Sequence, residues 1–79
     1  MDLIARKKWY QAMLRRPEWK EVRALVLERD YWQCQRCFIS KPAILQVHHL
    51  KYIGQYPWDT PLEFLQTLCK SCHFREHSY

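Results

Sequence analysis

The sequence predicts a small α+β domain in which two N-terminal helices precede a β-hairpin and a C-terminal helix. Apolar residues recur at helical spacing in the first 30 positions, and residues 44–50 and 65–68 have the composition of short strands. Two Cys-x-x-Cys pairs flank this strand region. A chain of 79 residues makes one domain, residues 1–79, whose core alone gives a thin margin of stability. We therefore expect that something other than the hydrophobic core also stabilises the fold.

The composition favours a polyanionic partner. Thirteen lysines and arginines outnumber eight aspartates and glutamates, which gives a net charge of +5 and a pI near 9.2. Such an excess suits nucleic acid or an anionic membrane surface. No apolar run approaches the roughly 20 residues that span a bilayer, and the first residues lack the apolar region of a signal peptide. We expect a cytoplasmic protein without a membrane partner, whose cysteines stay reduced.

The first 30 residues are predicted to form a helical lead-in to a core of residues 31–79. An amphipathic helix over residues 2–16 is indicated by apolar side chains at Ala5, Trp9, Ala12 and Met13. A second helix is expected over residues 17–30, because proline is favoured at the first helical position. Its predicted buried stripe is Trp19, Val22, Leu25 and Val26. Its predicted outward basic residues, for which a solvated face and phosphate contact are the two alternatives, are Lys20, Arg23 and Arg29.

The core begins with short elements. Residues 31–33 are aromatic and predict a brief strand that leads into the first cysteine. A turn is expected at residues 40–42, a strand at residues 44–50 and a structured loop, rich in aromatic residues, at residues 51–60.

The hairpin then closes. We expect one helical turn at residues 61–64, the second strand at residues 65–68 and a terminal helix that opens at Cys72. The predicted order of elements after the lead-in is therefore strand, strand, helix.

The four cysteines are the most specific feature of the sequence. Cys34 and Cys37 form one Cys-x-x-Cys pair, and Cys69 and Cys72 form another. Two such pairs supply the four thiolates of a closed tetrahedral zinc site. The alternatives are an iron centre with four thiolates and a redox-active Cys-x-x-Cys pair. Zinc at this site would explain how so small a core folds, because the free energy of metal binding stabilises the folded state.

The four histidines form a second group. His73 and His77 stand at i and i+4, so both imidazoles share one face of the predicted terminal helix. His48 and His49 lie within the interval that the cysteine pairs enclose, and fold closure should bring the two groups together. Three imidazoles leave coordination positions open, as a catalytic ion requires. Reinforcement of the zinc site and incidental packing are the alternatives.

Together these motifs resemble the zinc-ribbon HNH endonucleases, whose ββα-metal core (the HNH or His-Me finger) consists of a β-hairpin, a metal ion and a helix. The resemblance covers about residues 32–77, and the helix at residues 18–30 is similar to a lead-in helix that many such domains carry. The segments that carry it are Cys34-x-x-Cys37, Val47-His48-His49-Leu50, Leu65-x-x-Leu68-Cys69-x-x-Cys72-His73 and His77.

The resemblance implies a role for each histidine. His48 would be a ligand of the catalytic ion, His49 the general base, and His73 and His77 the remaining ligands. A regular strand points adjacent side chains to opposite faces, so we expect a turn or bulge at His49. The expected cofactors are a structural Zn²⁺ and a catalytic divalent metal, Mn²⁺ or Mg²⁺ before Zn²⁺ or Ni²⁺.

The chain departs from the family pattern at Phe64, where an asparagine usually precedes the Leu-x-x-Leu-Cys segment. In members with the helical histidine pair that asparagine braces the hairpin loop, so its loss concerns loop bracing more than hydrolysis. Asp59, Thr60 or Glu63 could brace the loop instead.

These features predict a metal-dependent endonuclease whose partner is DNA. Lys51 and Arg75 are the expected phosphate contacts, and the basic clusters at residues 6–8 and 15–16 are weaker candidates. One catalytic site and no heptad repeat predict a monomer that nicks one strand with low sequence specificity.

Two other classes of function compete with this prediction. One is a non-catalytic nucleic-acid-binding module stapled by zinc, in which the histidines only pack. The other is a zinc-stapled protein-interaction domain, which would bind no metal at its histidines and show no salt-dependent affinity for DNA.

Overall fold

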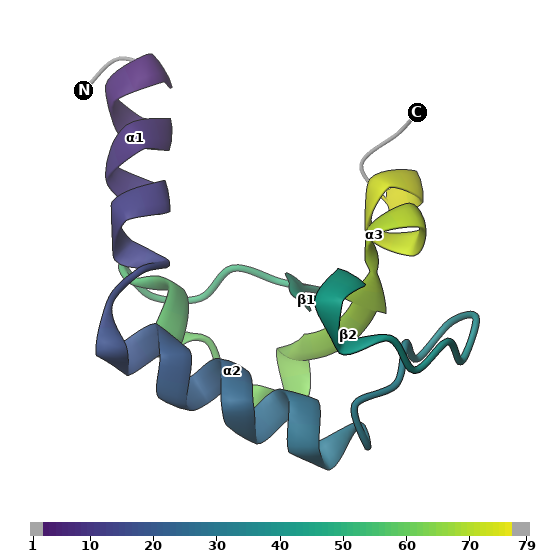
Figure 1. The fold of residues 1–79 in the computed structure, drawn as a ribbon. Coiled ribbons are helices and arrows are strands. Elements are labelled where there is room, and N and C mark those ends of the chain that lie inside the picture. The colour runs from purple at the N-terminus through teal and green to yellow at the C-terminus, as the bar shows by residue number, and fades with distance from the viewer. Residues whose placement is uncertain (1–2, 77–79) are drawn as a thin grey trace.

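The computed structural model describes residues 3–76 and confirms a small α+β fold with a ββα core. Helix α2 runs along the base of the molecule, α1 rises from its N-terminal end, and the hairpin and α3 lie on the other side (Figure 1). The elements are α1 Leu3–Met13, α2 Pro17–Arg29, β1 Leu45–His49, β2 Leu65–Cys69 and α3 Lys70–Glu76.

The junction of the first two helices is set by Pro17. Helix α1 ends at Met13, earlier than predicted, and the expected start at Asp2 lies outside the described residues. Arg16, which precedes the proline, is extended with φ −73° and ψ 148°, because the proline ring disfavours helical backbone before it. Pro17 then occupies the first turn of α2, as predicted. Among residues 3–76 no helix is both long and apolar enough to cross a membrane.

Helix α2 buries a face that the sequence located only in part. Trp19 and Val26 are buried as expected, whereas Leu25 is 55% exposed and Leu27 is fully buried in its place. A helix turns about 100° per residue, so Leu27 lies about 80° to one side of Trp19 and Leu25 about 120° to the other, and the buried face of α2 extends toward Leu27.

The strand predicted at residues 31–33 is wrong, because the chain makes a left-handed turn there. Tyr31 and Trp32 have φ values of 58° and 52°, a backbone conformation that ends helices and cannot continue as a strand. The Trp32 N–H donates to the Leu27 carbonyl oxygen over 2.8 Å and closes the last turn of α2. This reversal directs the chain toward Cys34.

The two strands pair in antiparallel register and join two hydrophobic clusters. Leu45 lies opposite Cys69 at one end of the hairpin, and His49 lies opposite Leu65 at the other. Val47, between these ends, packs against both clusters. The first cluster is Leu27, Cys34, Leu45, Leu68, Cys69 and Cys72, and the second is Trp19, Val26 and Leu65.

A buried carboxylate ties the end of α2 to β2. Asp30 Oδ2 accepts the Thr67 N–H over 2.9 Å, and both carboxylate oxygens accept hydrogen bonds from Arg29. Burial raises the pKa of Asp30, but the bonds from Arg29 and Thr67 outweigh it and hold this pKa below its usual value. Arg29, predicted to face outward, also donates to the Leu62 and Leu65 carbonyl oxygens. Its guanidinium therefore joins α2 to the start of β2.

Candidate metal centres and catalytic site

The four cysteines converge on one point, as predicted. The Sγ atoms of Cys34, Cys37, Cys69 and Cys72 all lie within 4.8 Å of one another, and the Cys37 and Cys69 sulfurs are 3.6 Å apart. Thiolates about 2.3 Å from one tetrahedral zinc ion stand roughly 3.8 Å apart, so the cluster has the dimensions of a zinc site. Cys34 follows α2, Cys69 ends β2 and Cys72 lies in α3, so this cluster joins three elements.

The protonation of the cluster also favours a bound cation. Burial raises the pKa of Cys34, but backbone N–H groups, with that of Cys37 first, lower it to about 6. Burial and the neighbouring sulfurs raise the pKa of Cys72 to about 12. Four thiolates this close together would need a cation to compensate their charge, which a zinc ion would supply.

Backbone contacts hold the first cysteine pair against the hairpin. The Cys34 N–H donates to the Ile39 carbonyl oxygen and the Phe38 N–H to the Cys34 carbonyl oxygen, each over 2.9 Å. The Gln35 N–H donates to the Thr67 carbonyl oxygen over 3.0 Å, which attaches this turn to β2. An ion pair between Arg36 and Glu76 links the same turn to α3.

Two of the predicted histidine ligands face each other. The rings of His48, on β1, and His73, on α3, have centroids 5.0 Å apart and meet edge to face at 69°. Two imidazoles bound to one ion at about 2.1 Å have centroids roughly 4.5–5.3 Å apart, so this pair has the spacing of shared ligands. His77, the predicted third ligand, lies outside the described residues.

His49 lies on the other face of β1 and is enclosed by aromatic rings. It stacks on Tyr52 with centroids 4.6 Å apart at 7°, and on Trp19 with centroids 5.3 Å apart at 16°. The expected bulge is absent from β1, because His48 pairs with Gln66 and His49 with Leu65 in regular register. The two adjacent histidines therefore point to opposite faces of the strand.

A backbone carbonyl selects the tautomer of His49. Its Nε2 lies 3.0 Å from the Pro57 carbonyl oxygen, and because that oxygen can only accept, Nε2 must carry the proton. Burial lowers the pKa of His49, and the bond to Pro57 opposes this shift without cancelling it. At neutral pH the imidazole is therefore uncharged, with its lone pair on Nδ1.

A groove of about 360 Å³ brings His49 and His73 to one surface, although they lie on different elements. Tyr10, Trp19, Arg23 and Tyr52 also line it. The Arg23 guanidinium donates to the Leu45 carbonyl oxygen over 3.3 Å, so this arginine, predicted to face outward, is anchored at the groove.

The sequence prediction assigned Tyr10, Trp19 and Tyr52 no role at the site, and gave Arg23 phosphate contact only as an alternative to solvation. Nothing in local spacing marks them, because α1, α2 and the loop meet only in the tertiary structure.

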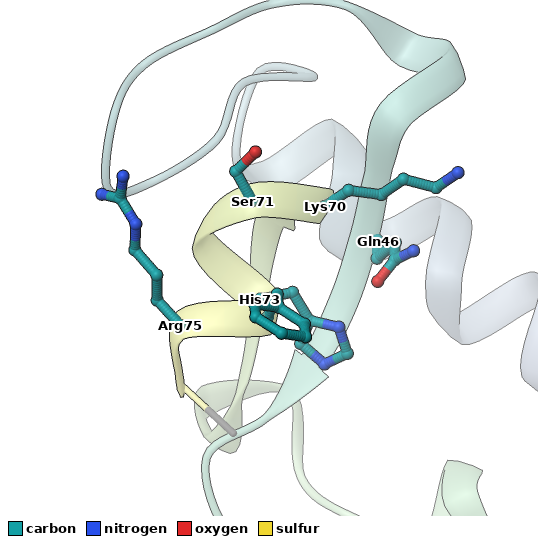
Figure 2. Close-up of a pocket in the computed structure, with 6 residues that line it drawn as sticks. Gln46, Lys70, Ser71, His73 and Arg75 are labelled. Carbon is teal, nitrogen blue, oxygen red and sulfur yellow. The ribbon is translucent and has the colours of Figure 1, made fainter. Parts of the chain in front are cut away.

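The two predicted phosphate contacts are both exposed but lie in different surroundings. Lys51 Nζ stands 5.6 Å above the ring of Phe64. Arg75 belongs to a shallow groove of about 650 Å³ beside α3, together with Gln46, Lys70 and His73. Figure 2 shows Arg75 and Lys70 extending to opposite sides of α3, with His73 between them near Gln46.

The loop after β1 is braced without the asparagine that Phe64 replaces. Asp59 Oδ2 accepts the N–H groups of Gln55 and Tyr56 over 3.0 and 2.8 Å. Thr60 Oγ1 exchanges two hydrogen bonds of 3.2 Å with the backbone of Ile53. Two of the three bracing residues proposed from the sequence therefore hold the loop.

Comparison with known proteins agrees with this geometry. The family model for HNH endonuclease matches residues 34–79, which contain both cysteine pairs and all four histidines. A protein of Lactococcus phage SK1 described as a probable HNH endonuclease is 32% identical over 83 residues, covering 99% of this chain and 84% of the relative. No solved structure matches. The chain therefore belongs to the HNH endonuclease family, which are phosphodiesterases.

Proposed function

We propose that this protein is a divalent-metal-dependent DNA endonuclease that nicks one strand with low sequence specificity. The observation that carries the proposal is the arrangement of three histidines around the hairpin. His48 and His73 face each other across β1 and α3, while His49 is fixed on the opposite face of β1 and shares a groove with His73.

His48, His73 and His77 would hold the catalytic divalent ion, and the four cysteines would hold a structural zinc ion. When bound, the catalytic ion supplies positive charge to the scissile phosphate and to the departing oxygen. The neutral imidazoles of His48 and His73 leave the charge of the ion uncompensated, which favours an anionic ligand. The expected ions are Mn²⁺ or Mg²⁺, which suit phosphate oxygen, before Zn²⁺ or Ni²⁺, which suit imidazole.

His49 would act as the general base. Its Nε2 is occupied by the Pro57 carbonyl, which leaves Nδ1 to take a proton from the attacking water. The stacked rings of Trp19 and Tyr52 fix the plane of the imidazole, so Nδ1 keeps one direction. The lowered pKa keeps the ring uncharged and able to accept at neutral pH.

Positive side chains around the site would hold the substrate. Arg23 lines the same groove as His49 and His73, and Arg75 lines the neighbouring groove beside α3. Together with Lys51 they suit contacts to backbone phosphates, which give affinity without reading the base sequence.

That the product is a single-strand nick follows from the presence of one general base in one chain. We further propose that residues 1–79 act as one domain and as a monomer, because α2 of the lead-in packs its Trp19 and Val26 against Leu65 of the core. One site cuts one strand per encounter, and so short a chain leaves few side chains to reach base edges.

Plasmid cleavage tests the proposal. With Mn²⁺ or Mg²⁺ added to the zinc-loaded protein at limiting concentration, we expect supercoiled plasmid to become open circle well before linear DNA accumulates. Linear product from the earliest times, without open circle, would show concerted cleavage of both strands and contradict nicking by a monomer. No cleavage with any of the four divalent metals would contradict the endonuclease proposal itself.

A further inference from the structure

Outside the core, α1 forms one wall of a groove that has no part in the proposed chemistry. The groove has a volume of about 850 Å³ and lies between α1 and the loop after β1. Arg6, Lys7 and Gln11 contribute to it from α1, and Tyr52 and Gln55 contribute from the loop.

This groove adjoins the catalytic groove. Tyr10 and Tyr52 line both, and their rings meet edge to face with centroids 6.2 Å apart. The ring of Tyr10 also stands 6.4 Å from that of His49. A ligand that extends from the scissile position past Tyr10 would therefore enter the groove beside α1.

The lining of the groove identifies the chemical class of its ligand. Arg6 and Lys7 are exposed cations, Gln11 and Gln55 offer amides, and no acidic side chain among residues 3–76 lines it. Cations hold phosphates, and the neighbouring aromatic rings offer flat surfaces for a sugar or a base. An acidic protein would suit the cations alone and would not need continuity with His49.

We infer that the groove beside α1 binds the DNA strand that flanks the cut, with Arg6 and Lys7 on its backbone phosphates. The inference rests on the proposed endonuclease function and extends it to the lead-in helix. Helix α1 is then a second substrate-binding surface, so the enzyme grips DNA both at the cut and beside it.

The test measures DNA binding, so it does not depend on cleavage. The double variant Arg6→Gln/Lys7→Gln and the unaltered protein, both loaded with zinc and without added Mn²⁺ or Mg²⁺, are titrated with a fluorescent DNA duplex at several salt concentrations. Each phosphate contact contributes about 0.9 to the slope of log affinity against log salt concentration, so we expect the slope to flatten by about 1.8.

A matched control separates the groove from net charge. The variant Lys20→Gln/Lys41→Gln removes the same charge from exposed positions outside the lining of this groove, and its slope should change by less than one contact, about 0.9. The substitution Gln11→Glu adds a carboxylate to the groove without removing a cation, and it should also weaken binding. Equal slopes in the two double variants, or an unchanged slope in the groove variant, would overturn the inference.

A small substrate keeps the two proposals distinguishable. Bis(p-nitrophenyl) phosphate is a phosphodiester without a flanking strand, so the Arg6→Gln/Lys7→Gln variant should hydrolyse it as fast as the unaltered protein. This equality also shows that the variant is folded. If the unaltered protein cleaves neither this diester nor plasmid, the endonuclease proposal fails while the slopes still decide the groove. If cleavage is normal and the slopes are equal, only the groove inference fails.

Discussion

The two groups of candidate metal-binding residues on the hairpin, the cysteines and the histidines, differ in how open they are to a substrate. At the end where Leu45 pairs with Cys69, four sulfurs close around one point and three of the four cysteines are buried. His49, which pairs with Leu65 at the other end, instead borders an open groove that runs along β1 to Leu45 and that His73 of α3 also lines. A closed ligand set excludes substrate and suits a structural ion, whereas an open one suits catalysis. The two five-residue strands thus help to position both the closed cysteine cluster, which suits stability, and the open groove, which suits catalysis.

The largest expected effect breaks the cysteine end. Cys69→Ser should abolish zinc binding and unfold the domain, because binding a structural zinc contributes about 10–16 kcal/mol, as much as the whole stability of a small domain. Circular dichroism and zinc content check this, with Ser71→Ala, an exposed neighbour on α3, as the control. A Cys69→Ser protein that keeps its helicity and one equivalent of zinc would contradict the structural assignment.

The next largest effect is expected on the cleavage rate when His49 is replaced, and the fold should stay intact. His49→Ala should reduce the cleavage rate by about 10²–10⁴-fold, the usual contribution of a general base. Zinc content, circular dichroism and DNA affinity should stay close to those of the unaltered protein. Loss of the catalytic metal together with the activity would make His49 a ligand and the assignment as base wrong.

His73→Ala separates a ligand from a base among the histidines. Because it removes one imidazole from the pair with His48, it should raise the Mn²⁺ concentration for half-maximal cleavage by about tenfold or more, a loss of at least ~1.4 kcal/mol in metal affinity. Excess Mn²⁺ should then restore part of the rate, which it should not do for His49→Ala. A normal metal requirement in His73→Ala would remove this histidine from the ligand set.

A smaller effect tests the tie that holds the hairpin to α2. Asp30→Ala leaves the Thr67 N–H and the Arg29 Nε–H without their acceptor, which should cost about 1–3 kcal/mol of unfolding free energy. Urea unfolding of the zinc-loaded protein at neutral pH measures it. Glu28→Ala, which changes an exposed acid on the same helix, is the control and should be near neutral. Equal stability of the two variants would show that the tie contributes nothing.

The smallest expected effect sharpens the role of the aromatic rings around His49. Tyr52 is 64% exposed yet stacks on His49, so Tyr52→Ala should not unfold the domain. It should lower kcat about two- to tenfold, since an aromatic pair contributes about 0.5–1.5 kcal/mol. Tyr52→Phe keeps the ring and should keep the rate. If both variants lose activity equally, the hydroxyl and not the stacking is what His49 requires.

Local spacing explains what the sequence predicted well. Two residues separate the members of each cysteine pair, and Pro17 stands at a helix start, so both features were predictable without knowledge of the fold. The convergence of the cysteines is therefore confirmed, as is the order of helices and strands apart from the strand expected at residues 31–33. The roles of His48, His49 and His73 stay predictions, which the variants above test.

Tertiary contacts explain what was missed. Leu25 was placed in the core because it is apolar, yet the angle of α2 against the hairpin decides that Leu27 is buried instead. Residues 31–33 have strand composition, but they must reverse the chain before Cys34. Arg23 and Arg29 were predicted to face outward. The carbonyl oxygens that accept their hydrogen bonds come near them only in the folded chain.

Cys72 and His73 are adjacent in the chain, and this adjacency couples the two proposed metal sites. Cys72 supplies a sulfur to the cysteine cluster, and the next residue, His73, supplies the imidazole that faces His48. Holding Cys72 in place therefore also restricts the position of His73. If both proposed sites are occupied, zinc binding at Cys72 would position His73 for the second ion. In a cell short of zinc, the freshly made chain would remain inactive however much manganese or magnesium surrounded it.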